Sequence, residues 1–451
     1  MLKTTLTVVL SLLASFAHAA ATPSGEILTL PHKEVTLTNG VRVFMVKYPS
    51  PHVVAYELPV HVGSRNEVEE GKTGFAHFFE HLMFRGTKHL SGKAFGDLYT
   101  KLGCENNAWT SYDMTNYHGV VASDNLAKIL EAEADRFINL EFSEKVLRDE
   151  AGAVLGEYNK DVAQPEFLLE EKLMATAFEK HPYSHTTMGY KDDVLKYTER
   201  YKDVWPFFRR YYRPSNVSIV LVGDVDFAKN LKDIETYFGA WKDPELAPSA
   251  IPVEPEQTSA REAQVKLDKP TQTRITVAYK VPAFTTKNTD VAALDLLAEM
   301  LFSVTSDFQK EFRFEKKWLD SVSASGNESV DPGIWTIGLR LSEAGEGKNA
   351  ELIAAVERVI ASVRDKQPDA ERLAATKKRF RNAAITSWFG APDSLADRIA
   401  IYTNFEHDVG VLNRMFERLG EVGPGTINEV AKRYLTDARK TTVTLSGTRG
   451  I

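Results

Sequence analysis

The segment His77-Phe78-Phe79-Glu80-His81 carries three side chains whose chemical types and spacing suit metal chemistry. If this segment is helical, His77 and His81 lie on one face with Cβ atoms about 5–6 Å apart, so both imidazoles can converge on one ion. Glu80 lies beside the second histidine, where a carboxylate can take a proton from water at the metal and later return it. The pattern therefore predicts a divalent-metal site, with zinc as the expected ion, two histidine ligands and Glu80 as general base.

A catalytic zinc ion needs a third protein ligand, and a carboxylate from another helix is the usual complement. Residues 143–160 are predicted to form a helix that carries Glu150 and Glu157, seven residues apart and so on one face. The residues between them, 151–156, are all apolar or small, and two carboxylates on an otherwise buried face are stabilised by a cation within reach. We expect Glu157 to be the third ligand and Glu150 to be a catalytic residue that supports the ligands from behind. The alternative is that both are solvated acids on the rim of the helix.

The remaining reactive residues are expected to have structural roles only. The segment Glu67-Val68-Glu69-Glu70 is expected to be a solvated acidic loop with no required function. Cys104, the only cysteine of the chain, is expected to be a small packed side chain rather than a nucleophile. Packing or surface roles are also expected for five histidines that are not at ligand spacing, namely His61, His89, His118, His181 and His185.

Short apolar strands and amphipathic helices surround the motif. A helix is predicted at 74–84 for the motif itself, and segments 107–110 and 115–121 are predicted to pair as a hairpin. The turn Asn39-Gly40 is expected to divide 34–46 into two short strands. The other elements are predicted strands at 53–62, 216–222, 275–279, 322–324, 335–341 and 441–445, and predicted helices at 94–102, 124–138, 143–160, 166–178, 204–212, 226–238, 288–302, 350–365 and 370–388.

The length of the chain indicates more than one domain. It has 451 residues, of which 43% are hydrophobic and 26% charged, which is the balance of a globular protein with ample material for sizeable cores. The acidic stretch 242–257 contains four prolines and predicts a linker, after which strands and helices recur in a similar plan. We expect an α+β pseudo-repeat with a metal-binding catalytic domain at 27–241, a linker at 242–262, and a related domain without a metal site at 263–451.

The N-terminus has the pattern of a secretory signal peptide. A basic start with Lys3 precedes an apolar run, and Ala17-His18-Ala19 fits a cleavage site, so residues 1–19 are predicted to be removed on export. The alternative is an N-terminal membrane anchor. The mature chain would then carry 54 Lys and Arg against 62 Asp and Glu, which disfavours nucleic-acid binding. One cysteine excludes both an internal disulfide and a Cys-rich zinc site. We expect a periplasmic protein with no membrane attachment after cleavage.

The block from Gly74 to Thr87 resembles the active-site block of the insulinase/pitrilysin superfamily of inverted zincins, which includes mitochondrial processing peptidase. In that superfamily the metal motif has the order His-x-x-Glu-His. The resemblance is strong over about residues 30–240 and weaker beyond. It extends to Val62-Gly63-Ser64-Arg65-Asn66-Glu67, Asn107-Ala108-Trp109-Thr110, Thr115-Asn116-Tyr117, His181-Pro182-Tyr183, Tyr211-Tyr212-Arg213-Pro214-Ser215-Asn216 and Gly223-Asp224.

The resemblance implies a fold, a site and a mode of substrate binding. Each half would be a mostly antiparallel sheet packed on helices. His77, His81 and Glu157 would hold Zn²⁺, Glu80 would be the general base, and Glu150 would stand behind the ligands. The segment around Asn107 and Ala108 would bind a peptide substrate as an added edge strand. Family peptidases typically form a chamber of four such units, so a chain with two units would form a homodimer, or a heterodimer with a related subunit.

One departure from the family pattern concerns the second half. Family members often place an arginine there, and seven residues later a tyrosine, to hold the substrate and stabilise the oxyanion. Here the arginine position matches Arg313, whereas Asp320 stands at the tyrosine position and would repel an oxyanion. Two hypotheses follow. The chain is an exported zinc endopeptidase or oligopeptidase, or it is a metal-binding subunit that is inactive or weak without a partner chain. A zinc hydrolase of non-peptide substrates has no specific support.

Overall fold

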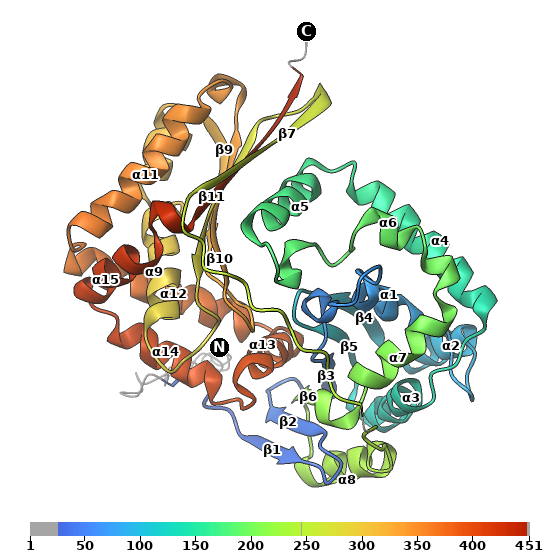
Figure 1. The fold of residues 1–451 in the computed structure, drawn as a ribbon. Coiled ribbons are helices and arrows are strands. Elements are labelled where there is room, and N and C mark those ends of the chain that lie inside the picture. Colours follow the sequence, from blue (N-terminus) through green and yellow to red (C-terminus); the bar gives the residue numbers. More distant parts are fainter. Residues whose placement is uncertain (1–25, 245, 449–451) are drawn as a thin grey trace, which may run out of the picture.

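The computed structural model describes residues 26–244 and 246–448, and the predicted signal peptide lies outside these residues. Two sheets packed on helices form the molecule, one in each half of the chain (Figure 1). This confirms the predicted α+β class with two similar, mostly antiparallel units. None of the helices in the described part of the chain combines the length and the apolar character that a membrane crossing requires.

The first sheet has six strands in the order β1-β2-β6-β3-β5-β4. The turn at Asn39-Gly40, where Gly40 has a φ of 99°, sets the antiparallel register of β1 and β2, with Val35 opposite Val43. β4 lies at the edge of the sheet and, among residues 26–244 and 246–448, pairs only with β5. The strands are β1 (His32–Thr36), β2 (Arg42–Lys47), β3 (Val53–Val60), β4 (Glu105–Thr110), β5 (Thr115–Ala122) and β6 (Ser218–Gly223).

Helices of the first half cover one face of this sheet and enclose a core rich in aromatic side chains. The helices of this half are α1 (Phe75–Leu82), α2 (Gly92–Leu102), α3 (Leu126–Ile138), α4 (Glu144–Asp161), α5 (Pro165–Ala177), α6 (Lys191–Val194), α7 (Tyr201–Tyr211) and α8 (Phe227–Phe238), of which α5 packs on the second sheet instead. α1, which carries the metal motif, lies between β4 and α4.

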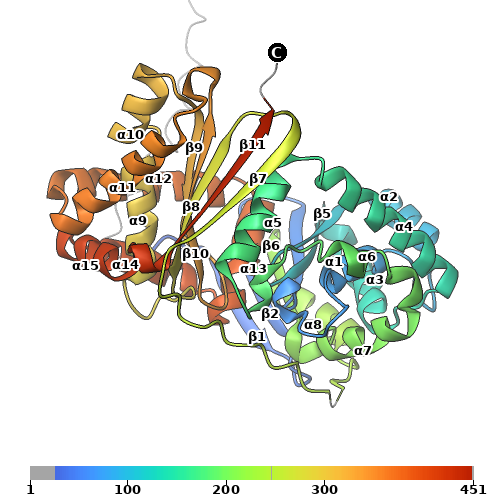
Figure 2. The same cartoon turned by 45° about the horizontal axis from the view of Figure 1, so that its top comes forward.

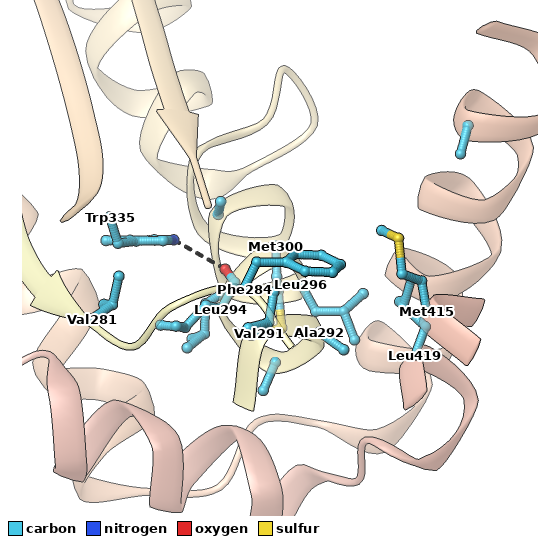
Figure 3. Packing of buried hydrophobic residues seen from close by; sticks show 14 of the residues in the cluster. Val281, Phe284, Val291, Ala292, Leu294, Leu296, Met300, Trp335, Met415 and Leu419 are labelled. Atoms are coloured by element: carbon cyan, nitrogen blue, oxygen red, sulfur yellow. Dashed lines mark hydrogen bonds between the residues drawn. The ribbon is translucent and has the colours of Figure 1, made fainter. Parts of the chain in front are cut away.

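The second sheet has five strands in the order β7-β11-β8-β10-β9. Its core centres on Trp335, which is fully buried and donates its indole N–H to the carbonyl of Leu294 at 3.0 Å (Figure 3). The strands are β7 (Arg261–Pro270), β8 (Arg274–Val281), β9 (Leu319–Ser325), β10 (Gly333–Leu341) and β11 (Lys440–Thr448). The helices are α9 (Asp290–Phe302), α10 (Asp307–Gln309), α11 (Asn349–Asp365), α12 (Ala370–Trp388), α13 (Pro392–Glu406), α14 (Val411–Glu421) and α15 (Pro424–Tyr434).

The two halves interlock, because each contributes a helix to the other's sheet. α13 packs against β3 and β6, so that Leu395 and Ile399 share a core with Val220 of the first sheet. In the other direction, α5 lies against β7 and β11, and Leu173 packs on Ala278 and Val443. A cavity of about 640 Å³ remains between the halves, bounded by α5, α13, the turn between β4 and β5, and strands β8 to β10.

Glu254, in the segment between α8 and β7, attaches that segment to the first half. Glu254 accepts hydrogen bonds of 2.9–3.1 Å from three successive backbone N–H groups, those of Glu179, Lys180 and His181. Such a nest of N–H groups is a typical binding site for an anion. A basic residue of the second half also lies near Glu254: Lys280 of β8, whose Nζ is 3.6 Å from the carboxylate. The Glu254 carboxylate therefore contacts groups of both halves.

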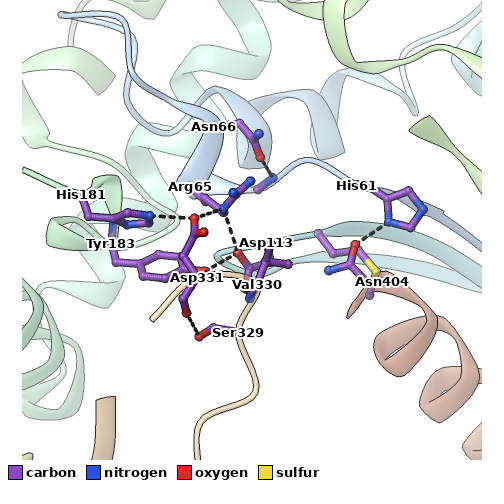
Figure 4. A network of polar contacts seen from close by, with 12 residues as sticks. His61, Arg65, Asn66, Asp113, His181, Tyr183, Ser329, Val330, Asp331 and Asn404 are labelled. Carbon is purple, nitrogen blue, oxygen red and sulfur yellow. Dashed lines mark hydrogen bonds and ion pairs between the residues drawn. The ribbon is translucent and has the colours of Figure 1, made fainter. Parts of the chain in front are cut away.

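A second polar network joins the halves beside the cavity (Figure 4). Asp331, in the loop before β10, accepts from Arg65 Nε at 2.5 Å and contacts His181 Nε2 at 2.9 Å. The backbone N–H of Val330 donates to Asp113, in the turn after β4, at 3.0 Å. Burial favours the neutral form of Asp331, but the bonds from His181 and Arg65 outweigh it and lower the pKa from 3.8 to about 2.

We predict that Asp331→Asn lowers the free energy of unfolding by about 1–3 kcal/mol at neutral pH, since hydrogen bonds to charged groups contribute amounts of this order. A carboxylate with a depressed pKa stabilises the folded state above its unfolded pKa, and this contribution disappears as the pH falls from about 4 to about 2. Urea unfolding at pH 7 and near pH 2.5 measures both effects. Asp97→Asn, at an exposed surface pair with Lys93, is the control and should change little. A loss for Asp331→Asn that does not depend on pH would contradict this assignment.

Candidate metal centre

Helix α1 begins where a buried carboxylate caps it. Glu67 accepts hydrogen bonds from the backbone N–H groups of Gly74 at 2.6 Å and Ala76 at 2.7 Å. The expectation that Glu67 belongs to a solvated acidic loop is wrong: its side chain is fully buried, and burial raises its pKa well above the ordinary value. The first N–H groups of a helix have no partner within the helix, and Glu67 supplies one from the preceding loop.

The apolar side of α1 fixes its rotation about its own axis. Phe78 stacks on Tyr197 with ring centroids 4.5 Å apart, and Phe79 stacks on Phe207 at 5.3 Å. Because these rings occupy the core side, the remaining residues of the motif are turned away from the core, toward α4 and β4. The aromatic residues within the motif therefore set the direction in which its polar side chains point.

The predicted ligands converge in space. Glu157 Oε2, on α4, lies 3.4 Å from His81 Nε2 and 3.8 Å from His77 Nε2. All three potential ligand atoms lie within 4.8 Å of one another. A tetrahedral zinc ion with bonds of about 2.0–2.1 Å requires ligand atoms about 3.3 Å apart, so the two measured separations are close to those that zinc needs.

The protonation of the ligands also fits a metal ion. Nδ1 of His81 lies 2.8 Å from Glu150 Oε1, so in the neutral ring the proton belongs on Nδ1, toward this acceptor, and the lone pair on Nε2. That lone pair faces the Glu157 carboxylate. Burial lowers the pKa of His77 to about 3, which keeps this ring neutral, whereas at His81 the effect of burial is outweighed by Glu150, Glu157 and Glu80, which raise the pKa and favour a positive charge at that ring. Acceptors that face one another need a cation between them, and two imidazoles with one carboxylate form a typical zinc ligand set.

Glu150 and Arg85 stand behind His81. Glu150 is buried, and Arg85 Nε lies 2.5 Å from one of its oxygens while Nη2 donates to the other at 3.0 Å. This bidentate contact between Arg85 and Glu150 holds the carboxylate against the His81 ring. Glu150 therefore contacts His81, and its role as the support of a metal ligand stays a prediction. Arg85 was not predicted to take part, because it lies beyond the end of α1 and its contact with Glu150 depends on the path of the chain after the helix.

The Glu80 side chain lies on the β4 side of the three predicted ligands. Its Oε2 accepts a hydrogen bond of 2.6 Å from the hydroxyl of Thr110, the last residue of β4. Burial raises the pKa of Glu80, and the Thr110 bond and His81 oppose that shift. Thr110 was also missed by sequence reasoning, because its contact with Glu80 depends on how β4 approaches α1.

The predicted substrate residues lie on the neighbouring edge strand. Asn107 is exposed and Ala108 is buried, both on β4, whose outer edge carries no further strand of the described chain. A free edge with unpaired backbone groups is what an added peptide strand requires. Trp109, between Ala108 and Thr110, lines the cavity between the halves.

Arg313 is not brought to this centre by its own chain. It lies in a short π-helix, Lys310–Glu315, after α10, at the opposite end of the molecule from α1 (Figure 2). There it donates to Gln309 Oε1 at 3.0 Å and lies over the ring of Phe314. Asp320 accepts from Gln272 at 2.6 Å in the same region. Any role of either residue at this metal centre would need a second chain.

Comparisons with known proteins bear on the family of the chain. Residues 42–191 match the sequence model described as insulinase (peptidase family M16), and residues 199–380 match the peptidase M16 inactive domain. The chain is 30% identical over 421 residues to the protein named zinc protease PqqE of Helicobacter pylori, which covers 92% of each protein. The chain belongs to the insulinase family, peptidase family M16. The predicted resemblance to this family is thereby confirmed.

Other relatives of this M16 chain are also named as peptidases. A protein of Arabidopsis thaliana named "Probable mitochondrial-processing peptidase subunit beta" is 27% identical over 65% of this chain and 53% of its own length. A crystal structure of a protease from Helicobacter pylori has a TM-score of 0.84 and 29% identity, over 92% of this chain and all of that one. A peptidase M16 inactive domain from Pseudomonas fluorescens, at 17% identity and a TM-score of 0.82, shares the fold.

We predict that Glu150→Ala lowers the zinc affinity of this M16 chain about 10- to 100-fold, since His81 loses the group that orients it. Competition with a chromophoric chelator measures the affinity. Asp149→Ala changes the adjacent residue, whose side chain is exposed and pairs with Lys145, and is the matched control. Equal affinities for the two variants would show that Glu150 does not support the ligands.

A further prediction concerns the cap of α1. Glu67→Gln should lower the free energy of unfolding by about 1–3 kcal/mol, because one amide oxygen cannot serve both N–H groups and the amide NH₂ is left buried beside them. Thermal or urea unfolding monitored by circular dichroism measures the change. Glu70→Gln, at an exposed position of the same loop, is the control. A Glu67→Gln variant as stable as the control would contradict the capping role.

Proposed function

We propose that this protein is an exported, zinc-dependent endopeptidase or oligopeptidase that hydrolyses peptides with Glu80 as general base. The observation that carries the proposal is the convergence of His77, His81 and Glu157 within 4.8 Å, with Glu80 beside them. Membership of a peptidase family, and relatives named zinc proteases, support the same conclusion.

The side chains of the site divide the chemistry among them. His77, His81 and Glu157 would hold zinc, which when bound acts as a Lewis acid on the scissile carbonyl and makes water more acidic. The Glu80 carboxylate takes the proton of the attacking water and passes it to the leaving amine. Thr110 occupies one oxygen of Glu80, which leaves the other for this transfer. Glu150 and Arg85 keep His81 in the orientation that presents Nε2.

The substrate site that we propose begins at β4. An extended peptide would add to the free edge of this strand at Asn107 and Ala108, which places its backbone beside Glu80 through the Thr110 contact. Because Trp109 and the turn after β4 line the cavity between the halves, a peptide that extends past Thr110 would enter it. In this scheme residues 27–241 form the catalytic domain, residues 242–262 the linker, and residues 263–451 the related domain without a metal site.

We further propose a periplasmic location, which rests on the signal-like pattern of residues 1–19. The protein would act as a homodimer or as a heterodimer with a related subunit, since the family chamber needs more units than one chain provides. The name of one relative, a processing peptidase subunit beta, is consistent with pairing.

One alternative has a specific observation behind it. Asp320 stands where family members often have an oxyanion donor, and Arg313 lies just after α10, at the opposite end of the molecule from α1. The protein would then be a metal-binding subunit that needs a partner chain for turnover. Peptide hydrolysis by the purified chain, at one zinc per chain and with no second polypeptide present, would exclude this alternative.

We predict that Glu80→Gln lowers kcat/KM for a fluorogenic peptide library by about 10²- to 10⁴-fold, because the amide cannot accept the proton of water. Zinc content, measured by elemental analysis, should stay at the wild-type value, since Glu80 is not a ligand. Removal of zinc by a chelator should abolish activity of the wild type, and zinc should restore it. A Glu80→Gln variant that keeps both its zinc and its activity would refute the proposed mechanism.

A further inference from the structure

The hydroxyl of Thr110 joins the edge strand β4 to Glu80. Thr110 is the last residue of β4, and its Oγ1 donates to Glu80 Oε2 at 2.6 Å. A bond between a hydroxyl and a carboxylate at this distance is charge-assisted and among the stronger hydrogen bonds in proteins. Neither residue is fully buried, so this contact lies at the accessible surface of the site rather than within the core.

The single proton of this hydroxyl is committed to Glu80. The other acceptor within reach is Thr115 Oγ1, across the hairpin, at 3.5 Å, which is too long for a strong bond. Thr115 in turn donates its own hydroxyl to the carbonyl of Val62 at 2.9 Å, and this bond is buried. The two threonines are thus paired in the strand register but serve different partners. Of the two threonines, only Thr110 donates its hydroxyl to Glu80.

β4 therefore presents different groups on its two faces and its edge. Side chains alternate along a strand, so Ala108 and Thr110 face α1 while Trp109 faces the cavity. The outer backbone edge is unpaired within the described chain. One short strand thus carries the proposed docking edge for the peptide and the hydroxyl that holds the general base.

We propose that Thr110 is a positioning residue that fixes the Glu80 carboxylate and couples peptide docking on β4 to the orientation of the base; this rests on the proposed function. One oxygen of Glu80 is held by the hydroxyl, so the other is directed toward the water that it deprotonates. A bound peptide strand would hydrogen-bond to the free edge of β4 and restrict its motion, whereas without substrate β4 is hydrogen-bonded to a strand on one side only. The base is consequently best ordered when substrate is bound.

Two variants that should both keep the fold test the proposal. Thr110→Val keeps the shape and the β-branching but removes the hydroxyl, and Thr110→Ser keeps the hydroxyl. For Thr110→Val we expect kcat to fall by about tenfold or more, with KM within about twofold of wild type and with unchanged zinc content. Thr110→Ser should stay within about threefold of the wild-type kcat. Equal losses in both variants, or a loss that appears only in KM, would overturn the positioning role.

A second readout does not require activity. Crystal structures of zinc-loaded wild type, Thr110→Val and Thr110→Ser report the place of the Glu80 carboxylate directly. We expect the carboxylate to rotate away or lose order in Thr110→Val and to keep its place in Thr110→Ser. A carboxylate that is unmoved and equally ordered in Thr110→Val would overturn the inference. If the wild type hydrolyses no peptide and the carboxylate nevertheless moves, the positioning role stands and the proposed function fails.

Discussion

The structure depends on one electrostatic constraint, which is that three acceptor groups face a single point between α1 and α4. His81 Nε2 and Glu157 Oε2 are 3.4 Å apart, and His77 approaches the same oxygen from 3.8 Å. Lone pairs at these separations repel unless a cation lies between them. A divalent ion satisfies all three groups at once, and the surrounding residues can then be understood as what keeps the groups in place.

Residues from three different parts of the fold hold the groups around this point in place. Glu67 caps the start of the helix that bears the histidines. Glu150, clamped by Arg85, sets the ring of His81. Thr110 reaches from the edge strand to Glu80, the proposed general base. A site of this kind requires that α1, α4 and β4 keep their mutual positions, which explains why α1 is packed so thoroughly by aromatic rings. The interlocked halves and their ionic contacts extend the same rigidity to the cavity beside β4.

The parts of the site that are encoded by local spacing were predictable from the sequence. Helical periodicity brought the motif histidines to one face, and the same rule put Glu150 and Glu157 on one face of a second helix. The contacts of Glu67 and Thr110 were not predictable in this way, because they depend on how a loop and a strand approach α1. In the fold, the strands and the helices up to α12 were mostly predicted. β7 and α13 to α15 were not predicted: β7 follows the proline-rich stretch and only Ala263, Val265 and Leu267 supply its apolar face, and α13 is apolar on several sides because it packs between the halves.

Anomalous diffraction from crystals of the purified chain, recorded on both sides of the zinc absorption edge, tests the central claim most directly. We expect one zinc peak per chain, about 2.0–2.2 Å from a ring nitrogen of His77, from Nε2 of His81 and from an oxygen of Glu157. A peak bound by other residues, or no peak in crystals grown with zinc while these three side chains remain in place, would contradict it.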